Sequence, residues 1–219
     1  MELDELNLHV WRGRGHFARP AIPTGCADLD SRLPGGGWPQ GAITEVFLDR
    51  YGIGEVTLLI PALASLTHSA APEAKKWIAW IAPPFIPYAP ALEQRGVNVE
   101  RLLMIHPAAS GKNGLWATEQ SIRSGSSSGV LAWLPQVDAV ALRRLQLAAE
   151  ERNCWTVLFR PLDALQNRSP AALRIKLSRE AAALAVEICK CRGGQPGTVT
   201  VADSATTPKE NPKENKQWS

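Results

Sequence analysis

Long apolar runs and a strong charge of either sign are both missing from this chain of 219 residues. No stretch approaches the roughly 18 uninterrupted apolar residues of a membrane-spanning helix, so we expect no such helix. The acidic segment 1–6 lacks the apolar core of a secretory signal, and we therefore expect a cytoplasmic protein. The formal net charge of +3 does not by itself indicate nucleic-acid binding.

Metal-binding residue types are also sparse, with four cysteines and four histidines in the whole chain. Cys189 and Cys191 are separated by one residue, but the histidines show no ligand spacing. Thiols in a reducing compartment need not pair, and we interpret these four as core or surface thiols. The sequence therefore predicts no metal site.

Positive charge is concentrated in residues 143–192, which hold ten Lys/Arg against five Asp/Glu. Its basic residues include Arg174 and Lys176 in one apolar run and Lys190 and Arg192 in another. This modest basic face either contacts DNA or RNA or is an ordinary solvated surface, and the sequence leaves both interpretations open.

Apolar residues make up 45% of the chain, which is enough for a packed core and excludes a largely disordered protein. Residues 1–20 are short and mixed in composition, and we expect an exposed N-terminal arm. Residues 203–219 are almost entirely polar, so we expect a disordered C-terminal tail. The remaining segment, 21–202, is expected to form one domain.

Eight tryptophans are many for a chain of this length. Most lie inside apolar runs and are expected in the core, whereas Trp11 and Trp218 lie in the terminal segments. Tryptophan and arginine are enriched at interface hot spots, so Trp11, Arg12 and Arg14 are candidate partner-binding residues. The alternative is that the terminal tryptophans fold back onto the domain.

Short apolar runs alternate with helical patterns between the two tails. Helices are expected over about 54–69, 116–123 and 138–152, the last with a clear apolar stripe. The expected strands are Ile43–Leu48, Trp77–Ala82, Leu102–Ile105, Val130–Leu134, Trp155–Phe159, Leu173–Leu177 and Leu184–Cys189. Several of these runs are apolar on both faces, which is typical of buried parallel strands. The order predicts an α/β fold with a doubly wound, mostly parallel sheet flanked by helices, and with an antiparallel hairpin at one edge.

A Gly-containing loop follows the first expected strand and leads into a helix, which is the layout of a phosphate-binding loop. An active loop ends in Gly-Lys-Ser/Thr, whose lysine neutralises the phosphates and whose hydroxyl binds Mg²⁺. Here Gly54 is followed by Glu55, which would repel a polyphosphate, and by Val56, which cannot bind a metal. Gly52 is retained, while the hydroxyl of Thr57 comes one residue too late. We expect a degenerate loop that binds neither nucleotide nor any other cofactor.

The three glycines at 35–37 and the carboxylate of Glu55 each have a structural and a functional interpretation. Gly35-Gly36-Gly37 could cradle an anion, but a turn with positive φ beside the sheet is favoured. Glu55 could be a catalytic acid, but no His, Cys or second carboxylate lies near it in the sequence. Stabilisation of a helix N-terminus is the simpler role for that residue.

Residues 22–46 resemble the RecA recombinase family. The matching residues are Thr24-Gly25, Leu29-Asp30, Leu33 with Gly35-Gly36-Gly37, Pro39 with Gly41, and Glu45 on a strand. The resemblance implies a RecA-like fold for 21–202. That family carries a magnesium aspartate at the position of Trp133 and a catalytic glutamate near 82–85, where this chain has no acid. Phosphoryl transfer depends on such charges, so we expect a non-enzymatic protein with no catalytic residues.

The chain resembles the ImuA family more closely, a group of bacterial damage-inducible proteins related to RecA and to SulA. The motifs are Trp11-Arg12-Gly13-Arg14, Leu33–Pro39, Gly52-Ile53-Gly54-Glu55, Leu58–Ala64 and Leu131–Pro135. The resemblance implies a non-enzymatic accessory role in SOS-induced, error-prone translesion DNA synthesis after DNA damage. The partners that it implies are an ImuB-like, polymerase-related protein, RecA and an error-prone DNA polymerase complex, with DNA reached only indirectly.

Two alternatives stay beside this interpretation. A SulA-like inhibitor of cell division, which binds the tubulin-like protein FtsZ, would share the fold and the dead nucleotide site. A RecA paralogue with residual ATP dependence is the other, although the missing lysine argues against it. The ImuA-like and the SulA-like interpretations both describe a protein that acts through protein–protein contacts.

Overall fold

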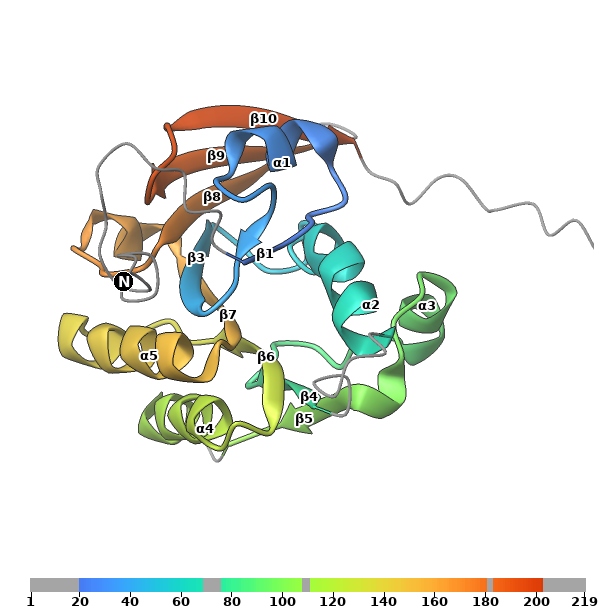
Figure 1. Ribbon diagram of the computed structural model, residues 1–219, viewed down its shortest axis with the longest axis vertical. Coiled ribbons are helices and arrows are strands. Elements are labelled where there is room, and N and C mark those ends of the chain that lie inside the picture. Colours follow the sequence, from blue (N-terminus) through green and yellow to red (C-terminus); the bar gives the residue numbers. More distant parts are fainter. Residues whose placement is uncertain (1–19, 69–75, 108–110, 181–182, 203–219) are drawn as a thin grey trace, which may run out of the picture.

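The computed structural model describes residues 20–68, 76–107, 111–180 and 183–202, and its centre is one eight-stranded sheet (Figure 1). In chain order the strands are β3 (Ala42–Leu48), β4 (Trp77–Ile81), β5 (Leu102–Ile105), β6 (Ser127–Trp133), β7 (Trp155–Pro161), β8 (Leu173–Glu180), β9 (Ala183–Cys191) and β10 (Gly197–Ala202). Their spatial order is β10-β9-β8-β3-β7-β6-β4-β5. A small antiparallel pair, β1 (Ala21–Ile22) and β2 (Trp38–Pro39), stands apart from this sheet.

The described residues form five α-helices. They are α1 (Ala27–Arg32), α2 (Ile60–His68), α3 (Ala89–Gln94), α4 (Gly111–Arg123) and α5 (Ala139–Arg152), and short 3-10 helices lie at η1 (Thr57–Leu59), η3 (Val99–Arg101) and η4 (Leu162–Gln166). The predicted start of α5 is confirmed, because the Asp138 carboxylate accepts a hydrogen bond from the Ala141 N–H at 2.7 Å. The helix ends at Asn153, whose φ of 49° is left-handed.

Each face of the sheet has its own apolar core. On β6, Val130 and Ala132 belong to one core and Leu131 and Trp133 to the other, because successive strand residues point to opposite faces. In Figure 1, α4 and α5 lie together on one side, and α2 and α3 lie on the other. Residues of α4 and α5 contribute to the first core, and residues of α1, α2 and α3 contribute to the second.

The expected RecA-like, doubly wound and mostly parallel sheet is wrong. The sheet is mixed: β8–β9 and β9–β10 are antiparallel, so the antiparallel part is a run of three strands rather than an edge hairpin. Within the described residues no α-helix separates β7 from β8, which are joined through η4. A doubly wound sheet needs a helix at each parallel crossover, and this half of the sheet does not follow that rule.

Two local expectations are decided by backbone geometry. The favoured turn at Gly35 and Gly36 is confirmed by φ values of 84° and 75°. At Gly37 a Cβ would lie 2.2 Å from the Ile22 carbonyl oxygen, so the approach to β1 requires glycine. The helix expected from residue 54 begins only at η1, and Pro61 falls in the first turn of α2, where proline is tolerated.

The expected N-terminal arm, with Trp11, Arg12 and Arg14, lies outside the described residues apart from residue 20, and so does the expected tail 203–219. No helix in the described part of the chain is long and apolar enough to cross a membrane. All four cysteines are free thiols, and burial raises the pKa of Cys154 to about 12. That thiol therefore stays protonated and unreactive at neutral pH.

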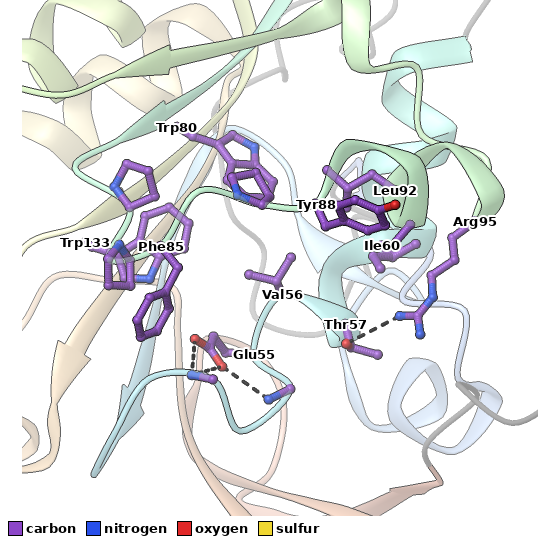
Figure 2. Close-up of a pocket in the computed structure, with 16 residues that line it drawn as sticks. Glu55, Val56, Thr57, Ile60, Trp80, Phe85, Tyr88, Leu92, Arg95 and Trp133 are labelled. Atoms are coloured by element: carbon purple, nitrogen blue, oxygen red, sulfur yellow. Dashed lines mark hydrogen bonds between the residues drawn. The ribbon is translucent and has the colours of Figure 1, made fainter.

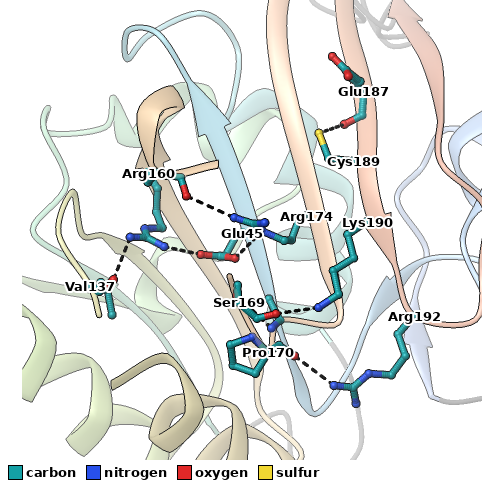
Figure 3. A network of polar contacts seen from close by, with 12 residues as sticks. Glu45, Val137, Arg160, Ser169, Pro170, Arg174, Glu187, Cys189, Lys190 and Arg192 are labelled. Carbon is teal, nitrogen blue, oxygen red and sulfur yellow. Dashed lines mark hydrogen bonds and ion pairs between the residues drawn. The ribbon is translucent and has the colours of Figure 1, made fainter. Parts of the chain in front are cut away.

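Three charged side chains join β3, β7 and β8 inside the protein (Figure 3). Glu45 is fully buried and accepts hydrogen bonds from Arg160 Nη1 at 2.6 Å and from Arg174 Nε at 2.9 Å. Arg160 also donates to the Val137 carbonyl at 3.0 Å, and the Arg174 guanidinium lies 4.8 Å from the centre of the Phe47 ring. One carboxylate is therefore shared by two buried guanidinium groups.

The basic side chains of β8 and β9 make hydrogen bonds and ion pairs within the domain. Arg174 fits neither a nucleic-acid surface nor a solvated one, since it is paired with Glu45 in the core. Lys190 donates to the Ser169 carbonyl at 2.8 Å and Arg192 donates to a neighbouring carbonyl at 3.1 Å. Lys176 pairs with a glutamate on the surface. The local excess of positive charge is therefore smaller on the surface than the sequence suggests.

Candidate functional site

The loop between β3 and η1 folds its own carboxylate onto its backbone (Figure 2). Glu55 accepts hydrogen bonds from the N–H of Gly52 at 2.9 and 3.1 Å and from the N–H of Gly54 at 3.2 Å. Both glycines have left-handed φ values, 85° and 113°, which let the two N–H groups point at one carboxylate. Glu55 is 4% exposed. It closes the loop rather than capping a helix.

The carboxylate also affects its neighbour in the loop. Burial, and secondarily the negative charge of Glu55, raises the pKa of Tyr51. The phenol of Tyr51 therefore stays protonated to a higher pH than a free tyrosine does.

An aromatic cluster lies beside the loop, at the carboxyl ends of β4 and β6. Trp133, the last residue of β6, stacks on Phe159 with ring centres 4.5 Å apart and an interplanar angle of 20°. Its ring centre also lies 5.6 Å from that of Trp80, in a tilted arrangement. Such aromatic pairs contribute about 0.5–1.5 kcal/mol each beyond their buried area. The position at which the RecA resemblance puts a magnesium ligand is therefore part of an apolar floor.

The chain leaves β4 through a sharp turn at Ala82. Its φ of 53° is left-handed, a conformation that costs a non-glycine residue about 1 kcal/mol, and its N–H donates to the Ile105 carbonyl at 2.8 Å. The next segment, 83–88, contains three prolines that each fix their own φ. It also holds three large apolar side chains in solvent, Phe85, Ile86 and Tyr88.

The loop, the aromatic floor and the segment 83–88 enclose a cleft of about 340 Å³, closed on another side by α3 (Figure 2). Leu92 of α3 and Arg95, the residue that follows α3, line the cleft, and Arg95 Nη1 lies 3.5 Å from Thr57 Oγ1. Among the residues described as lining the cleft, Arg95 is the one cation and Glu55 the one anion. Clefts of this size accept a small molecule or a few side chains of a partner.

The structure brings the predicted loop residues together. All six positions of the degenerate nucleotide loop line the cleft, namely Gly52, Gly54, Glu55, Val56, Thr57 and Trp133. The sequence interpretation missed the opposite wall, where Phe85, Tyr88 and Arg95 lie. The apolar, proline-rich run 83–88 could have indicated this wall. The sequence analysis considered part of it only because it lacks the catalytic glutamate that the RecA resemblance implies.

The residues of this cleft do not fit a nucleoside triphosphate. The N–H groups that would hold a phosphate in a loop of this layout are bonded to Glu55, which also repels polyphosphate. Val56 and Trp133 cannot bind Mg²⁺, and nowhere in the described part of the chain do three His, Cys, Asp or Glu side chains gather as a metal site would require. The expectation of a P-loop fold is therefore wrong, because the loop is closed on its own side chain.

We expect no heat of binding and no phosphate release when the chain is titrated with Mg-ATP. The Glu55→Gln variant should give the same result, because removing the charge supplies neither a lysine nor a metal ligand. Isothermal calorimetry and a phosphate-release assay on both proteins measure this. Micromolar affinity or measurable turnover by the native chain would contradict it.

Comparison with known proteins places this region inside a matched family segment. The family described as "Cell division inhibitor SulA" matches residues 41–156, which include every residue of the cleft. The chain is 30% identical over 115 residues to the cell division inhibitor SulA of Edwardsiella piscicida, covering 52% of this chain and 68% of that protein. It is 27% identical over 125 residues to that of Serratia marcescens, covering 57% of this chain and 71% of that protein.

These relatives overturn one expectation and favour another. Translesion synthesis, the first functional interpretation of the sequence, is wrong, since the matched family and these relatives are named as inhibitors of cell division. The interpretation kept as its alternative, a SulA-like inhibitor, is the one that they support.

Proposed function

Because this chain belongs to the SulA family, we propose that it inhibits bacterial cell division by binding the tubulin-like division protein FtsZ. The proposed inhibitor is not an enzyme and needs no nucleotide. It acts by covering a surface of its partner, and the proposal implies a cytoplasmic protein.

One observation carries the proposal within the structure: apolar side chains stand exposed beside a phosphate loop that is closed. Glu55 accepts from the N–H groups of Gly52 and Gly54, so the loop itself offers no open anion site. Phe85 and Tyr88 are exposed on the other side of the same cleft. An apolar surface of this kind is typical of a protein-binding site.

Overproduction of the chain in a rod-shaped bacterium is expected to turn dividing cells into long filaments while growth in mass continues. The reason is that a bound division protein cannot assemble the septum. Cell length by microscopy measures this at matched protein levels. Damage-induced mutation frequency is the control, and it should not change. Cells of normal length with an altered mutation frequency would contradict the proposal.

The partner is tested directly by pull-down of purified FtsZ. ImuB-like protein and RecA, the partners that the translesion interpretation expects, serve as comparisons in the same assay. We expect retention of FtsZ alone. Retention of either comparison protein without FtsZ would contradict the proposed partner.

We also propose that this chain is an ImuA-like member of the SulA family. We base it on motifs beyond the matched segment as well as inside it, above all Trp11-Arg12-Gly13-Arg14. An Arg12→Ala and Trp11→Ala double variant in the FtsZ pull-down shows whether these residues also belong to the proposed interface.

A further inference from the structure

The segment 83–88 presents apolar side chains to solvent in a rigid form. Phe85 is 66% exposed, Ile86 85% and Tyr88 74%. Prolines precede or separate these residues and fix the backbone, so little conformational entropy remains to be lost when a partner binds. The ring of Phe85 reaches back towards the loop, where its Cε2 would lie 4.0 Å from a Cβ at Gly52. Phe85 and Tyr88 therefore belong to the rim of the cleft, and Ile86 is exposed between them in the chain.

The interior of the cleft is apolar and closed at its base. Trp80 and Trp133 are 1% and 4% exposed. Their rings contact each other, and the ring of Trp133 also stacks on Phe159. Leu92 and Ile60 complete the apolar lining next to α2 and α3. A volume of about 340 Å³ takes one or two large apolar side chains of a partner, but not a folded element.

The charges of the cleft select for a carboxylate. Glu55 is held by backbone N–H groups and is not available to a cationic partner. Arg95 is exposed, and its contact to Thr57 at 3.5 Å is too long to be a strong hydrogen bond. A guanidinium at the edge of an apolar cleft is suited to a partner carboxylate, which it can bind through two parallel hydrogen bonds.

We infer that this cleft is the docking site for the protein partner, and that it receives a short segment with a large apolar side chain and a neighbouring carboxylate. The inference rests on the proposed function and names the chemistry of the partner at that site. The apolar side chain enters between the rim and the aromatic floor. The carboxylate pairs with Arg95.

Two variants test the site against two matched controls on the opposite face of the sheet. The Phe85→Ser, Ile86→Ser and Tyr88→Ser triple variant should weaken FtsZ binding about 100-fold or more, and Arg95→Glu about tenfold or more. Arg95→Lys should retain most of the binding. The controls are Trp116→Ser, whose side chain is 66% exposed like that of Phe85, and the exposed Arg143→Glu. Both controls should bind within about twofold of the native chain.

A second measurement does not depend on FtsZ. The acetylated and amidated peptide Asp-Leu-Phe is titrated into the full chain while the indole N–H signals of Trp80 and Trp133 are followed by NMR. These signals should shift, less with the Asn-Leu-Phe peptide and less again in the Arg95→Glu variant. Thermal unfolding of every variant shows that the fold is retained.

The outcomes separate the docking site from the function. If the native chain and both cleft variants bind FtsZ equally, the docking site is overturned and the proposed function stands. If the native chain fails to bind FtsZ or to cause filaments, the proposed function is overturned, and the peptide titration alone decides the cleft. Absence of charge-dependent shifts in that case overturns the docking site as well.

Discussion

Replacing Glu45 with glutamine is expected to lower the free energy of unfolding by about 3–5 kcal/mol. The carboxylate is fully buried between Arg160 and Arg174, which are 1% and 8% exposed. Glutamine keeps the shape of the side chain but leaves two buried guanidinium groups without a counter-charge. The loss is a large fraction of the stability of a domain of this size.

Urea unfolding of the native chain and the variant measures this difference, with Glu187→Gln as the matched control. Glu187 also lies on a strand and pairs with Lys176 at 3.1 Å, but both side chains are well exposed. Breaking that pair should cost less than about 1 kcal/mol. Similar losses for the two variants would show that burial of the Glu45 ion pairs does not govern their contribution.

The sequence predicted elements whose signals are local. The helix α5 was predicted from its apolar stripe, and the structure shows that the Asp138 side chain caps its first turn. The parallel strands β3, β6 and β7 appear as apolar runs because both of their faces are buried. In the same way α4 was found, although its first turn was missed. Its N-terminal sequence, Gly111–Gly114, is poor in helix-forming residues.

The class of the sheet could not be predicted because its decisive strands carry weak signals. β10 alternates Thr and Val over six residues, and most of its positions are exposed or half-exposed at the sheet edge. The sequence analysis included it in the domain 21–202 but expected no strand there. Without β10 the antiparallel run of β8, β9 and β10 reduces to a hairpin, and the mixed sheet is mistaken for a parallel one.

The residues of the candidate site also fall into those that local sequence signals predicted and those that they did not. The degenerate loop is contiguous in sequence, so its residues were identified together, and Trp133 was added through the family resemblance. Arg174 was misassigned because its partner Glu45 is 129 residues away, and a lone arginine in an apolar run gives no sign of that pairing. The exposure of Phe85 and Tyr88 depends on how the segment 83–88 leaves β4, which no local pattern encodes.

The loop and the cleft together explain why this region does not hold a nucleotide. A phosphate loop normally leaves its N–H groups open to a ligand, whereas Glu55 satisfies them within the chain. Trp133, where the RecA resemblance implied a magnesium ligand, stacks on Phe159 in the apolar floor of the cleft. Neither Glu55 nor Trp133 leaves a site for a polyphosphate with its metal ion. Fold and chemistry are separable in this way.

Placing an acidic residue at position 133 is expected to destabilise the protein rather than to create a nucleotide site. Trp133→Asp removes a buried indole, a loss of about 3–5 kcal/mol, and adds the cost of a carboxylate among Trp80 and Phe159. Trp133→Phe keeps a ring in contact with both neighbours, and it should cost only about 1–2 kcal/mol. The larger loss expected for Trp133→Asp therefore combines lost packing volume with the burial of a charge.

Thermal and urea unfolding give the two stabilities, and calorimetry with Mg-ATP gives the affinity of whichever variant remains folded. We expect no binding by Trp133→Asp, because the N–H groups of Gly52 and Gly54 stay bonded to Glu55 and no lysine is present. The Trp133→Phe variant should still bind FtsZ, with a modest loss that reflects a less complete floor. A stable Trp133→Asp protein that binds Mg-ATP would show that one substitution reopens the nucleotide site, and that the closed loop does not exclude phosphate.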